Sequence, residues 1–467
     1  MRITNNMTTN KMLLNLNRNA NIVDKLFTQQ ATGKKIQMAS DDPIIASRAL
    51  KFRTNISETA QYARNVAQGL SWMEVTEQGF SNTIDIIKTI TEKCVQGAND
   101  PLAESDRKKI VTEIQSLYAQ LGTEMNISYA GRYVFSGYRT DEPPTFEANN
   151  SFIYDIEQNF SAQDVEKTKA YFKASADTAP EVYDVYRLKL PYSNASAITN
   201  PIVIGGSSFV VNTVATANAT AYTPADDEIT FIQDTGELIL GKDVVAAFNA
   251  AGAGDMTVEY TKTGFVKGEP NPKVYFKCTD RTTAPPINYN VDAQELQFEF
   301  GVNTRITINN MAKDVLTAQL YADLKALVET ISGIQMSTDA ALTAKYTTAG
   351  LTGEALENAV KEQKKEEEQK FSGLIHDRFS NMLELLSRHS ATISTEYTNL
   401  GSRMNRLELI ETRLEEDRVS YTDLMSKNED VNYLEVMMNL DSANAVYQAA
   451  MKAGASIMQM SLADFIR

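Results

Sequence analysis

Two long stretches of the chain carry apolar side chains in alternating steps of four and three residues, the spacing of a helix that packs along another helix. The first stretch follows Asp42 and Pro43, which favour a helix start because Asp can accept from the first free amides and Pro needs no amide partner there. Its positions are Ile45, Ala49, Phe52, Ile56, Thr59, Ala63, Val66, Leu70, Met73, Glu77, Phe80, Ile84 and Ile87. The pattern predicts one helix from residue 43 to the GANDP break at residues 97–101, roughly 80 Å long at about 1.5 Å per residue.

The second stretch lies far downstream and is the expected partner of the first. Its positions are Ile375, Phe379, Met382, Leu386, His389, Ile393, Glu396, Leu400, Arg403, Leu407, Ile410 and Leu414. We expect the two helices to pair within one chain, with residues 52–70 facing part of residues 375–414. A third, shorter helix is predicted over residues 104–129, and its short link to the first helix predicts an antiparallel hairpin.

Both ends of the chain carry a narrow apolar stripe. The positions are Leu13, Leu16, Ala20, Val23 and Phe27 near the start, and Leu440, Ala443, Tyr447, Ala450, Gly454 and Ile457 near the end. Each stripe alone would make only a marginal helix, because short isolated helices are unstable in water. We therefore expect the terminal helices to bury their stripes against each other or against other copies of the chain, and we regard these residues as the candidate assembly interface.

Between the long helices the apolar period falls towards two. Segments such as SSFVVNTV, GELILG, MTVEYT and KVYFKC, separated by Gly, Pro, Asn and Asp, are typical of short strands. A helix is also expected near residues 161–173. The predicted fold is α+β: a long-helix coiled-coil bundle built from both chain ends with an inserted mostly β domain. The expected domains are the terminal helices (1–30 and 431–467), a helical-bundle core (31–146 and 296–430) and the insert (147–295).

Composition narrows the classes of protein. The 467 residues carry a net charge of −15, which argues against nucleic-acid binding because phosphate backbones are bound through clustered Lys and Arg. No apolar run reaches the roughly 18 residues of a membrane span. The two cysteines, Cys94 and Cys278, lie far apart in unlike contexts, so we expect no disulfide between them. The N-terminal sequence has no apolar core or cleavage site of a secretory signal peptide.

Candidate chemistry is sparse. GELILGKD, residues 236–243, matches the phosphate-loop pattern up to Lys242, but Asp243 stands where a Ser or Thr is needed, so we interpret it as a strand between two turns. His376 and His389 lack companions for a metal shell, and we expect His389 to be a hydrogen-bonded interface residue. The charged run KEQKKEEEQK, residues 361–370, is typical of a solvated helix face. The sequence thus predicts no catalytic residue, metal site or cofactor, and no enzyme.

Three segments resemble one family. MRITNNM at the start, TGKKIQMASDDPIIASRAL at residues 32–50 and GRYVFSGYRTDEPPTF at residues 131–146 are similar to the flagellin superfamily. The last of these resembles the signature of its hook–filament junction subunits, and so does the ending NLDSANAVYQAAMKAGASIMQMSLADFI. LQFEFGVNTRITIN, residues 296–309, resembles the strand pair that returns from the insert to the bundle in this family. The middle of the chain carries no such resemblance.

The resemblance implies a structural subunit that joins the flagellar hook to the filament as a ring and so serves motility. It implies export through the flagellar type III channel without a cleavable signal peptide, an extracellular location at the hook–filament junction, and terminal helices that pair in the assembled tube. Because their stripes are narrow and their lengths short, we also expect these helices to be disordered in the monomer. The implied partners are copies of the chain, the neighbouring hook-associated junction protein, flagellin and a cytoplasmic export chaperone at the C-terminal helix. The insert is expected to be dispensable for assembly, because both long apolar stripes lie outside it.

Two other functions remain open. The chain could be a filament flagellin, against which FSGYRTDEPP and the LADFIR ending count. It could also be a flagellin-like scaffold that displays an adhesive insert. An enzyme within the insert would need a metal or nucleophile constellation, and residues 147–295 contain no His.

Overall fold

The computed structural model describes residues 5–99, 104–175, 178–199, 201–251, 256–292 and 294–465. These residues form two compact units. Unit 1 consists of the described residues up to Ala67, Glu299–Thr304 and the described residues from Leu407 onward. Unit 2 consists of the described parts of Gln68–Phe298 and of Arg305–Arg406. The three-domain division expected from the sequence stays a prediction.

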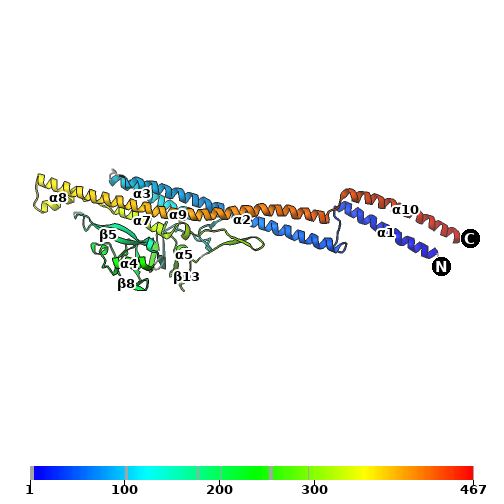
Figure 1. The fold of residues 1–467 in the computed structure, drawn as a ribbon, viewed down its shortest axis with the longest axis horizontal. Helices are drawn as coiled ribbons and strands as arrows, with labels where there is room; N and C mark the ends of the chain where they lie inside the picture. Colours follow the sequence, from blue (N-terminus) through cyan, green and yellow to red (C-terminus); the bar gives the residue numbers. More distant parts are fainter. Residues whose placement is uncertain are drawn as a thin grey trace. The chain divides into compact units, whose positions relative to one another are not determined.

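Helix α2 (Pro43–Ala98) is the first long helix that the sequence predicts, with bounds close to those expected (Figure 1). The side chain of Asp42 accepts from the amides of Ile44 at 2.9 Å and Ile45 at 3.1 Å, which confirms it as the N-cap. Every position of the predicted stripe is buried or half-buried. The spacing of apolar residues therefore identified the packed face of this helix.

Helix α9 (Glu354–Glu429) is the partner of α2 and runs antiparallel to it. In unit 2 the ring of Phe80 packs against the ring of Tyr397, with centroids 6.0 Å apart. In unit 1 Arg53 forms an ion pair with Glu429 at 2.7 Å. Positions early in α2 thus meet positions late in α9, and the expected pairing of the two long helices is confirmed.

The register of this pair differs from the one expected for the first part of α2. Arg53, next to Phe52, meets Glu429, which lies beyond the predicted partner segment ending at Leu414. Steps of four and three identify which face of a helix is apolar, but they repeat every seven residues. The pattern therefore does not determine which turn of α9 packs against a given turn of α2.

Helix α3 (Glu104–Met125) folds back on α2 as a hairpin. Lys93 pairs with Glu113 at 2.8 Å, and Asn82 donates to Glu124 at 2.8 Å, so the two helices are antiparallel as predicted. The remaining helices are α1 (Asn5–Thr32), α4 (Lys242–Ala251), α5 (Pro272–Tyr275), α6 (Ala312–Val315), α7 (Ala318–Gly333), α8 (Asp339–Thr348) and α10 (Tyr433–Phe465). The 3-10 helices are η1 (Ala162–Asp164) and η2 (Ala219–Tyr222).

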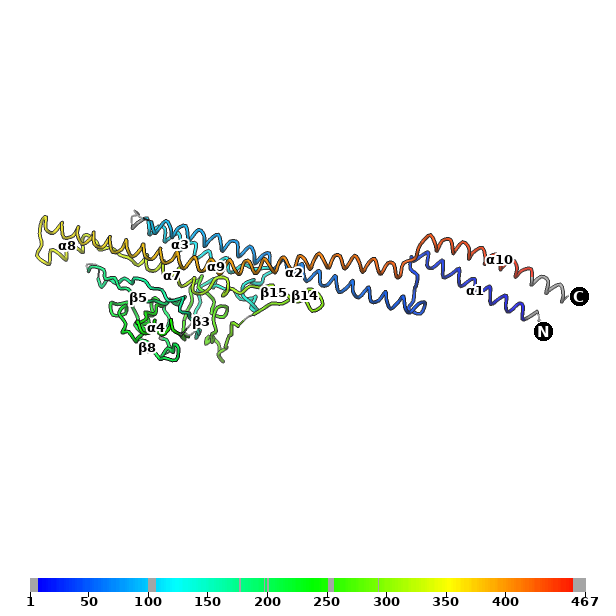
Figure 2. Tube along the Cα trace, in the orientation of Figure 1, coloured from blue at the N-terminus to red at the C-terminus, as the bar shows by residue number. Residues whose placement is uncertain are grey.

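The insert is built on one large sheet, which confirms an α+β fold with an inserted β domain (Figure 2). Its strands are β3 (Asn150–Phe160), β4 (Glu166–Phe172), β5 (Glu181–Lys189), β6 (Ala195–Ile198), β7 (Ile202–Ile204), β8 (Ser207–Val214), β9 (Glu228–Ile232), β10 (Glu237–Leu240), β11 (Met256–Phe265), β12 (Lys277–Asp280) and β13 (Ile287–Tyr289). The strand order is β13-β12-β3-β11-β7-β8-β9-β10-β5-β4, with β6 also on β11. The β8–β9 pair is parallel.

Two short hairpins accompany the large sheet. They are β1 (Ser128–Tyr129) with β2 (Arg132–Tyr133), and β14 (Gln297–Gly301) with β15 (Thr304–Thr307). The second hairpin is the strand pair that the resemblance implied for residues 296–309. In the segment between α3 and the insert, Phe135 packs edge to face on Phe80 of α2, with centroids 5.7 Å apart. Gly79 makes this contact possible, because a Cβ there would lie 2.9 Å from the Phe135 ring.

The prediction of a helix near residues 161–173 is wrong. This segment forms the single 3-10 turn η1 and then strand β4, which pairs with β5 over its whole length. The strand buries Thr168 and Ala170, two residues apart, on one face of the sheet. The Lys and Glu residues of this segment gave it a helix-like composition, and tertiary pairing overrode it.

The interpretation of KEQKKEEEQK as a solvated face is partly wrong. Most of its residues are exposed, but Gln363 and Glu367 are buried one helical turn apart. Glu367 accepts from the amide of Ser337 at 2.8 Å and from its hydroxyl at 2.6 Å. Lys173 of the insert lies 3.4 Å from the same carboxylate. A buried carboxylate needs such partners, which the sequence does not reveal.

Candidate functional site

The two terminal helices, α1 and α10, pair antiparallel within unit 1 (Figure 1). At one end of the pair the amide of Val431 donates to the carbonyl of Gly33 at 2.9 Å. Further along, Gly454 lies against Met12, since a Cβ at Gly454 would be 3.0 Å from Cε of that side chain. The small residue permits close approach of the helices. The expected contact between the two terminal stripes is therefore present inside a single chain.

The predicted interface residues do not all lie in this contact. Leu440 and Gly454 are buried, whereas Leu13 and Phe27 are exposed. Half-buried positions are Leu16, Ala20, Val23, Ala443, Tyr447 and Ala450. The side chain of Ile457 lies outside the described residues. Whether these residues contact other copies of the chain stays a prediction.

Many large apolar side chains of α1 and α10 have no cover within the chain. Leu434 is 73% exposed, Met438 67%, Leu14 67% and Phe27 61%. Two paired helices can bury only one stripe each, so an apolar residue outside the shared contact must face water or another surface. Exposed apolar area of this extent marks an interaction surface. Sequence analysis missed Leu14 and Leu434, because it followed one stripe per helix.

A groove of about 540 Å³ runs between α1 and α10. Its lining residues are Asn19, Ile22, Lys25, Leu26, Gln29, Asn439, Ser442, Ala443 and Val446. Among them only Ala443 belongs to the predicted interface. Ile22 and Val446, both exposed, give the groove an apolar character on each side.

A cluster of charged residues ties the segment after α1 to the link between α9 and α10. This junction cluster consists of Lys34, Arg53, Glu429 and Asp430. Nζ of Lys34 lies 2.8 Å from Glu429 and 2.5 Å from Asp430, and Arg53 lies 2.7 Å from the second oxygen of Glu429. The bonds to Asp430 and Glu429 raise the pKa of Lys34, and the bond from Lys34 lowers the pKa of Asp430.

Several residues of the TGKKIQMASDDP segment form the junction cluster or shape the turn beside it. Gly33 adopts a positive φ of 70°, which turns the chain after α1 and brings Lys34 to Asp430. The amide of Lys35 donates to the carbonyl of Glu429 at 2.7 Å, and the carboxylate of Asp41 accepts from the amides of Gln37 and Met38. Sequence analysis missed this cluster, because no periodic pattern connects Lys34 with a residue 395 positions away.

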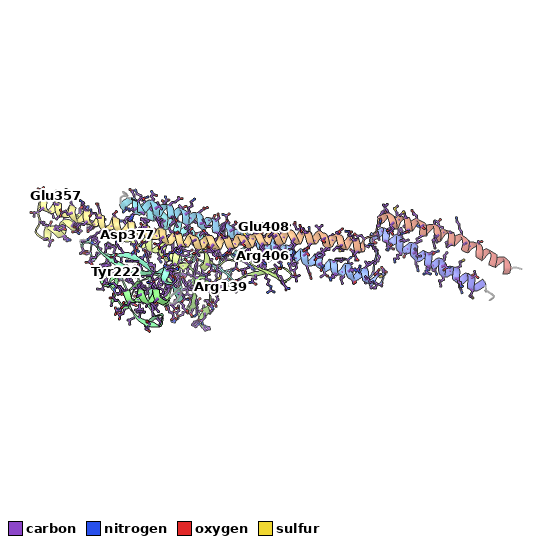
Figure 3. All side chains as sticks on the ribbon, viewed as in Figure 1. Arg139, Tyr222, Glu357, Asp377, Arg406 and Glu408 are labelled. Atoms are coloured by element: carbon purple, nitrogen blue, oxygen red, sulfur yellow. The ribbon has the colours of Figure 1, made fainter. Side chains whose placement is uncertain are left out.

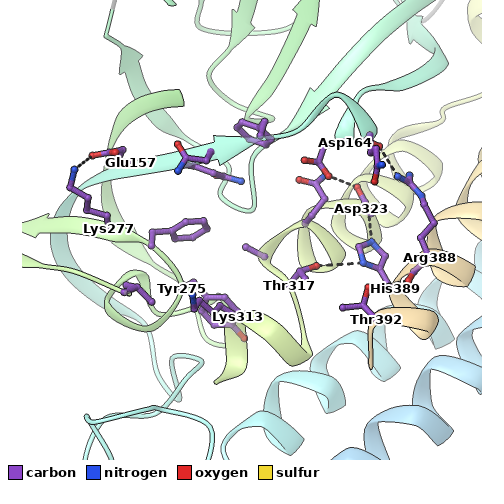
Figure 4. A pocket seen from close by; sticks show the side chains of 18 of the residues that line it. Glu157, Asp164, Tyr275, Lys277, Lys313, Thr317, Asp323, Arg388, His389 and Thr392 are labelled. Atoms are coloured by element: carbon purple, nitrogen blue, oxygen red, sulfur yellow. Dashed lines mark hydrogen bonds and ion pairs between the residues drawn. The ribbon is translucent and has the colours of Figure 1, made fainter. Parts of the chain in front are cut away.

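A second groove, of about 870 Å³, lies in unit 2 between the insert and helices α7 and α9 (Figure 4). His389 lies in its wall, with Nε2 3.0 Å from Asp323 and Nδ1 3.4 Å from the hydroxyl of Thr317. Lys277 pairs with Glu157 at 2.6 Å. The imidazole of His389 and the ammonium group of Lys277 thus each have a carboxylate partner. The prediction of a hydrogen-bonded interface histidine is confirmed.

The other candidate motifs fall into ordinary structural roles. GELILGKD forms strand β10, but the expected second turn is wrong, because helix α4 begins at Lys242 directly after Gly241. A Cβ at Gly241 would lie 2.2 Å from the carbonyl oxygen of Ala225, so the glycine is needed for this close approach. Cys94 and Cys278 are both free and buried. Within the described ranges no group of three or more His, Cys, Asp or Glu could hold a metal ion.

None of the helices in the described part of the chain is long and apolar enough to span a bilayer. This agrees with the hydropathy of the sequence.

Comparison with known proteins identifies the N-terminal part of the chain. Residues 3–140 match the model of the bacterial flagellin N-terminal helical region. Flagellar hook-associated protein 3 of Salmonella typhimurium is 33% identical over 132 residues, covering 27% of this chain and 41% of that protein. The Escherichia coli protein of the same name is 32% identical over 130 residues, covering 28% and 41%. The chain thus spans about two fifths of the length of these relatives.

Solved structures give a weaker likeness. The crystal structure of Xanthomonas campestris FlgL is 10% identical, with a TM-score of 0.35 over 79% of this chain and 98% of that one. The resemblance therefore rests on the sequence matches and not on the solved structures. Residues 3–140 match a flagellin N-terminal helical region, and the predicted resemblance to flagellar hook-associated protein 3 is confirmed.

Proposed function

We propose that this chain is a structural subunit of the bacterial flagellum that joins the hook to the filament as a ring of junction subunits. The observation that carries the proposal is the uncovered apolar surface of α1 and α10, where Leu434 and Met438 face solvent in the single chain. A subunit that works alone would not expose such residues on paired helices. Relatives of the chain are named hook-associated proteins and flagellins, and these names support a place for the chain in the flagellum.

The partners follow from this role. Copies of the chain would cover the exposed apolar residues, with Leu13, Leu16, Ala20, Val23, Phe27, Leu440, Ala443, Tyr447, Ala450, Gly454 and Ile457 at or near the assembly interface. The neighbouring hook-associated junction protein and flagellin would flank the ring. Before export, a cytoplasmic chaperone would hold the C-terminal helix, where Met437, Met438 and Met451 are exposed. The location would be extracellular, and the role would require no enzyme activity.

Filament flagellin is the second candidate, because flagellins also match part of the chain. A flagellin-like scaffold with an adhesive insert is the third. Electron microscopy of a deletion strain separates the first two. We expect hooks without filaments and unpolymerised flagellin in the medium. Short filaments instead would favour flagellin.

Complementation of the deletion strain tests the surface itself. Met438→Asp changes a side chain that is exposed in the single chain, so it should leave folding intact and yet place a charge inside the assembled contact. Exported amounts are matched, because Met438 also lies on the surface proposed for the chaperone. Gln448→Asp adds the same charge at another exposed position of α10 and serves as the matched control. We expect filaments with the control and none with Met438→Asp, at equal amounts of exported protein. Equal filament yields would show that Met438 is not covered in the assembly.

A further inference from the structure

Strand β4 is the last strand of the large sheet. It pairs with β5 along one edge, and among the described residues no strand lies beside its other edge. An open edge presents unpaired backbone amides and carbonyls, which can pair with a strand of another chain. Proteins usually block such an edge with charges, proline, a bulge or a covering element.

Helix α9 covers this open edge along its whole length, in antiparallel direction. Arg388 donates to the carbonyl of Gln163 at 2.6 Å, Asn381 to that of Lys167 at 3.4 Å, and Arg378 to that of Lys169 at 2.9 Å. Beyond these, the ring of Phe371 packs on that of Tyr171 with centroids 5.2 Å apart, and Glu367 meets Lys173 at 3.4 Å. A half-buried ion pair between Lys169 and Asp377 runs alongside at 2.6 Å; Figure 3 labels Asp377 on α9.

The spacing of these contacts along α9 matches their spacing along β4. The positions on α9 follow steps of four, seven, three and seven residues from Glu367 to Arg388, which places them on one face of the helix. From Lys167 to Lys173 the strand advances about 20 Å at about 3.3 Å per residue. From Glu367 to Asn381, their partners on α9, the helix advances about 21 Å at about 1.5 Å per residue. The two elements therefore stay in step from end to end.

Buried charged residues lie at the middle of the contact between α9 and the sheet. Arg378 and Arg187 are buried, and Glu166 at the start of β4 lies between them, 3.4 Å from Arg378 and 2.5 Å from Arg187. Burial disfavours the ionised form of Glu166, but the two guanidinium groups outweigh it and hold the pKa of this carboxyl at about 2. Arg187 also pairs with Glu237 at 2.7 Å. A charged network of this kind gives one preferred arrangement, because any displacement leaves a buried charge unpaired.

We propose that Arg378 and Asn381 of α9 act in place of the strand missing beside β4: they bond to its outward carbonyls and, with Arg388 on the turn η1 before the strand, hold the insert in register on α9 and prevent β4 from pairing with β4 of a second copy of this chain. This device explains why an edge strand can lack a protective proline or bulge. It is independent of the terminal helices and of the proposed role in the flagellum.

The test compares the full chain with Arg378→Met/Asn381→Leu, which removes two donors and keeps similar volume. Arg406→Met/Asn399→Leu makes the same changes at exposed positions of α9 and is the matched control. Residue-resolved amide exchange is measured for β4, with the interior strand β8 as reference. We expect exchange in β4 at least tenfold faster in the first variant, with β8 unchanged, and no change in the control. Exchange rates in β4 equal to those of wild type would overturn the proposal.

Sedimentation of the same proteins tests the pairing with a second copy. The first variant should self-associate more strongly with concentration than wild type and control. When Lys167→Pro is added to this variant, the additional self-association should disappear. The amide of Lys167 points outward with its carbonyl, and proline has no amide to donate. An excess that survives Lys167→Pro would contradict strand pairing. If the double variant does not fold, Asn381→Leu alone is measured by exchange, and unchanged protection of β4 overturns the proposal.

Discussion

Lys34 joins parts of unit 1 that lie 395 positions apart in the sequence. Its ammonium group bonds to two carboxylates, of which Glu429 is buried and Asp430 is half-exposed. Loss of Lys34 would leave Glu429 with Arg53 as its remaining ion-pair partner in the junction cluster. Because a buried carboxylate that loses a partner is costly, the effect should exceed that of an ordinary surface ion pair.

We expect Lys34→Met to lower the free energy of unfolding by about 1–2 kcal/mol at neutral pH. The raised pKa of Lys34 means that its contribution is complete below its ordinary value of 10.5 and is lost as pH rises through the raised value. The lowered pKa of Asp430 means that its contribution is present above 3.8 and is lost as pH falls through the lowered value. Urea unfolding at pH 3, 7 and 9 should therefore show the full difference at pH 7 and 9 and a smaller one at pH 3.

Lys51→Met removes the same charge from an exposed position of α2 and controls for the net charge of −15. An equal effect of both substitutions at pH 7 would assign the loss to net charge and contradict a specific role for the junction cluster.

At the scale of single elements, apolar periodicity predicted the helices well and the strands less well. The stripe of α2 is local information, since each turn repeats the same face. Strand β4 depends instead on β5 and α9, which lie far away in the sequence, and its Lys and Glu residues suggested a helix. The terminal stripes were predicted, but the exposure of Leu13 and Phe27 was not, because a stripe does not say whether its partner is in the same chain.

Within α9 the periodicity makes a sharp prediction. Leu400 lies on the predicted stripe and is fully buried, whereas Leu409 lies off it and is 72% exposed. Leu400→Ala should lower the free energy of unfolding by about 2–5 kcal/mol, because it removes buried methyl groups and leaves a cavity. Leu409→Ala should change it by less than about 0.5 kcal/mol. Equal effects of the two substitutions in urea unfolding would show that the packed face of α9 is assigned wrongly.

At the scale of the whole molecule, the contacts of the insert change what its removal should do. Replacement of residues 147–285 by a short Gly/Ser linker should still permit assembly, since both long stripes lie outside the insert. It should also lower the melting temperature by several degrees, because Phe371 and Arg378, both buried, lose their cover. Calorimetry and motility measure the two effects separately. Normal export without filaments would contradict dispensability, and an unchanged melting temperature would contradict a packed insert.

The terminal helices provide the last prediction, on the coupling of folding to assembly. Among the residues of α10 whose burial is described, only Val436, Leu440 and Gly454 are buried, and none of those of α1 is. A helix pair with so little buried area should open easily, whereas copies packed side by side would cover its exposed leucines and methionines. We expect the amides of α1 and α10 to exchange within seconds in the free monomer, while residues 45–87 of α2 stay protected. A chain that lacks residues 431–467 should accordingly keep its thermal stability and fail to join hook to filament. Strong protection of residues 440–457 in a monodisperse monomer would show that α10 folds stably on its own chain and would contradict assembly-coupled folding.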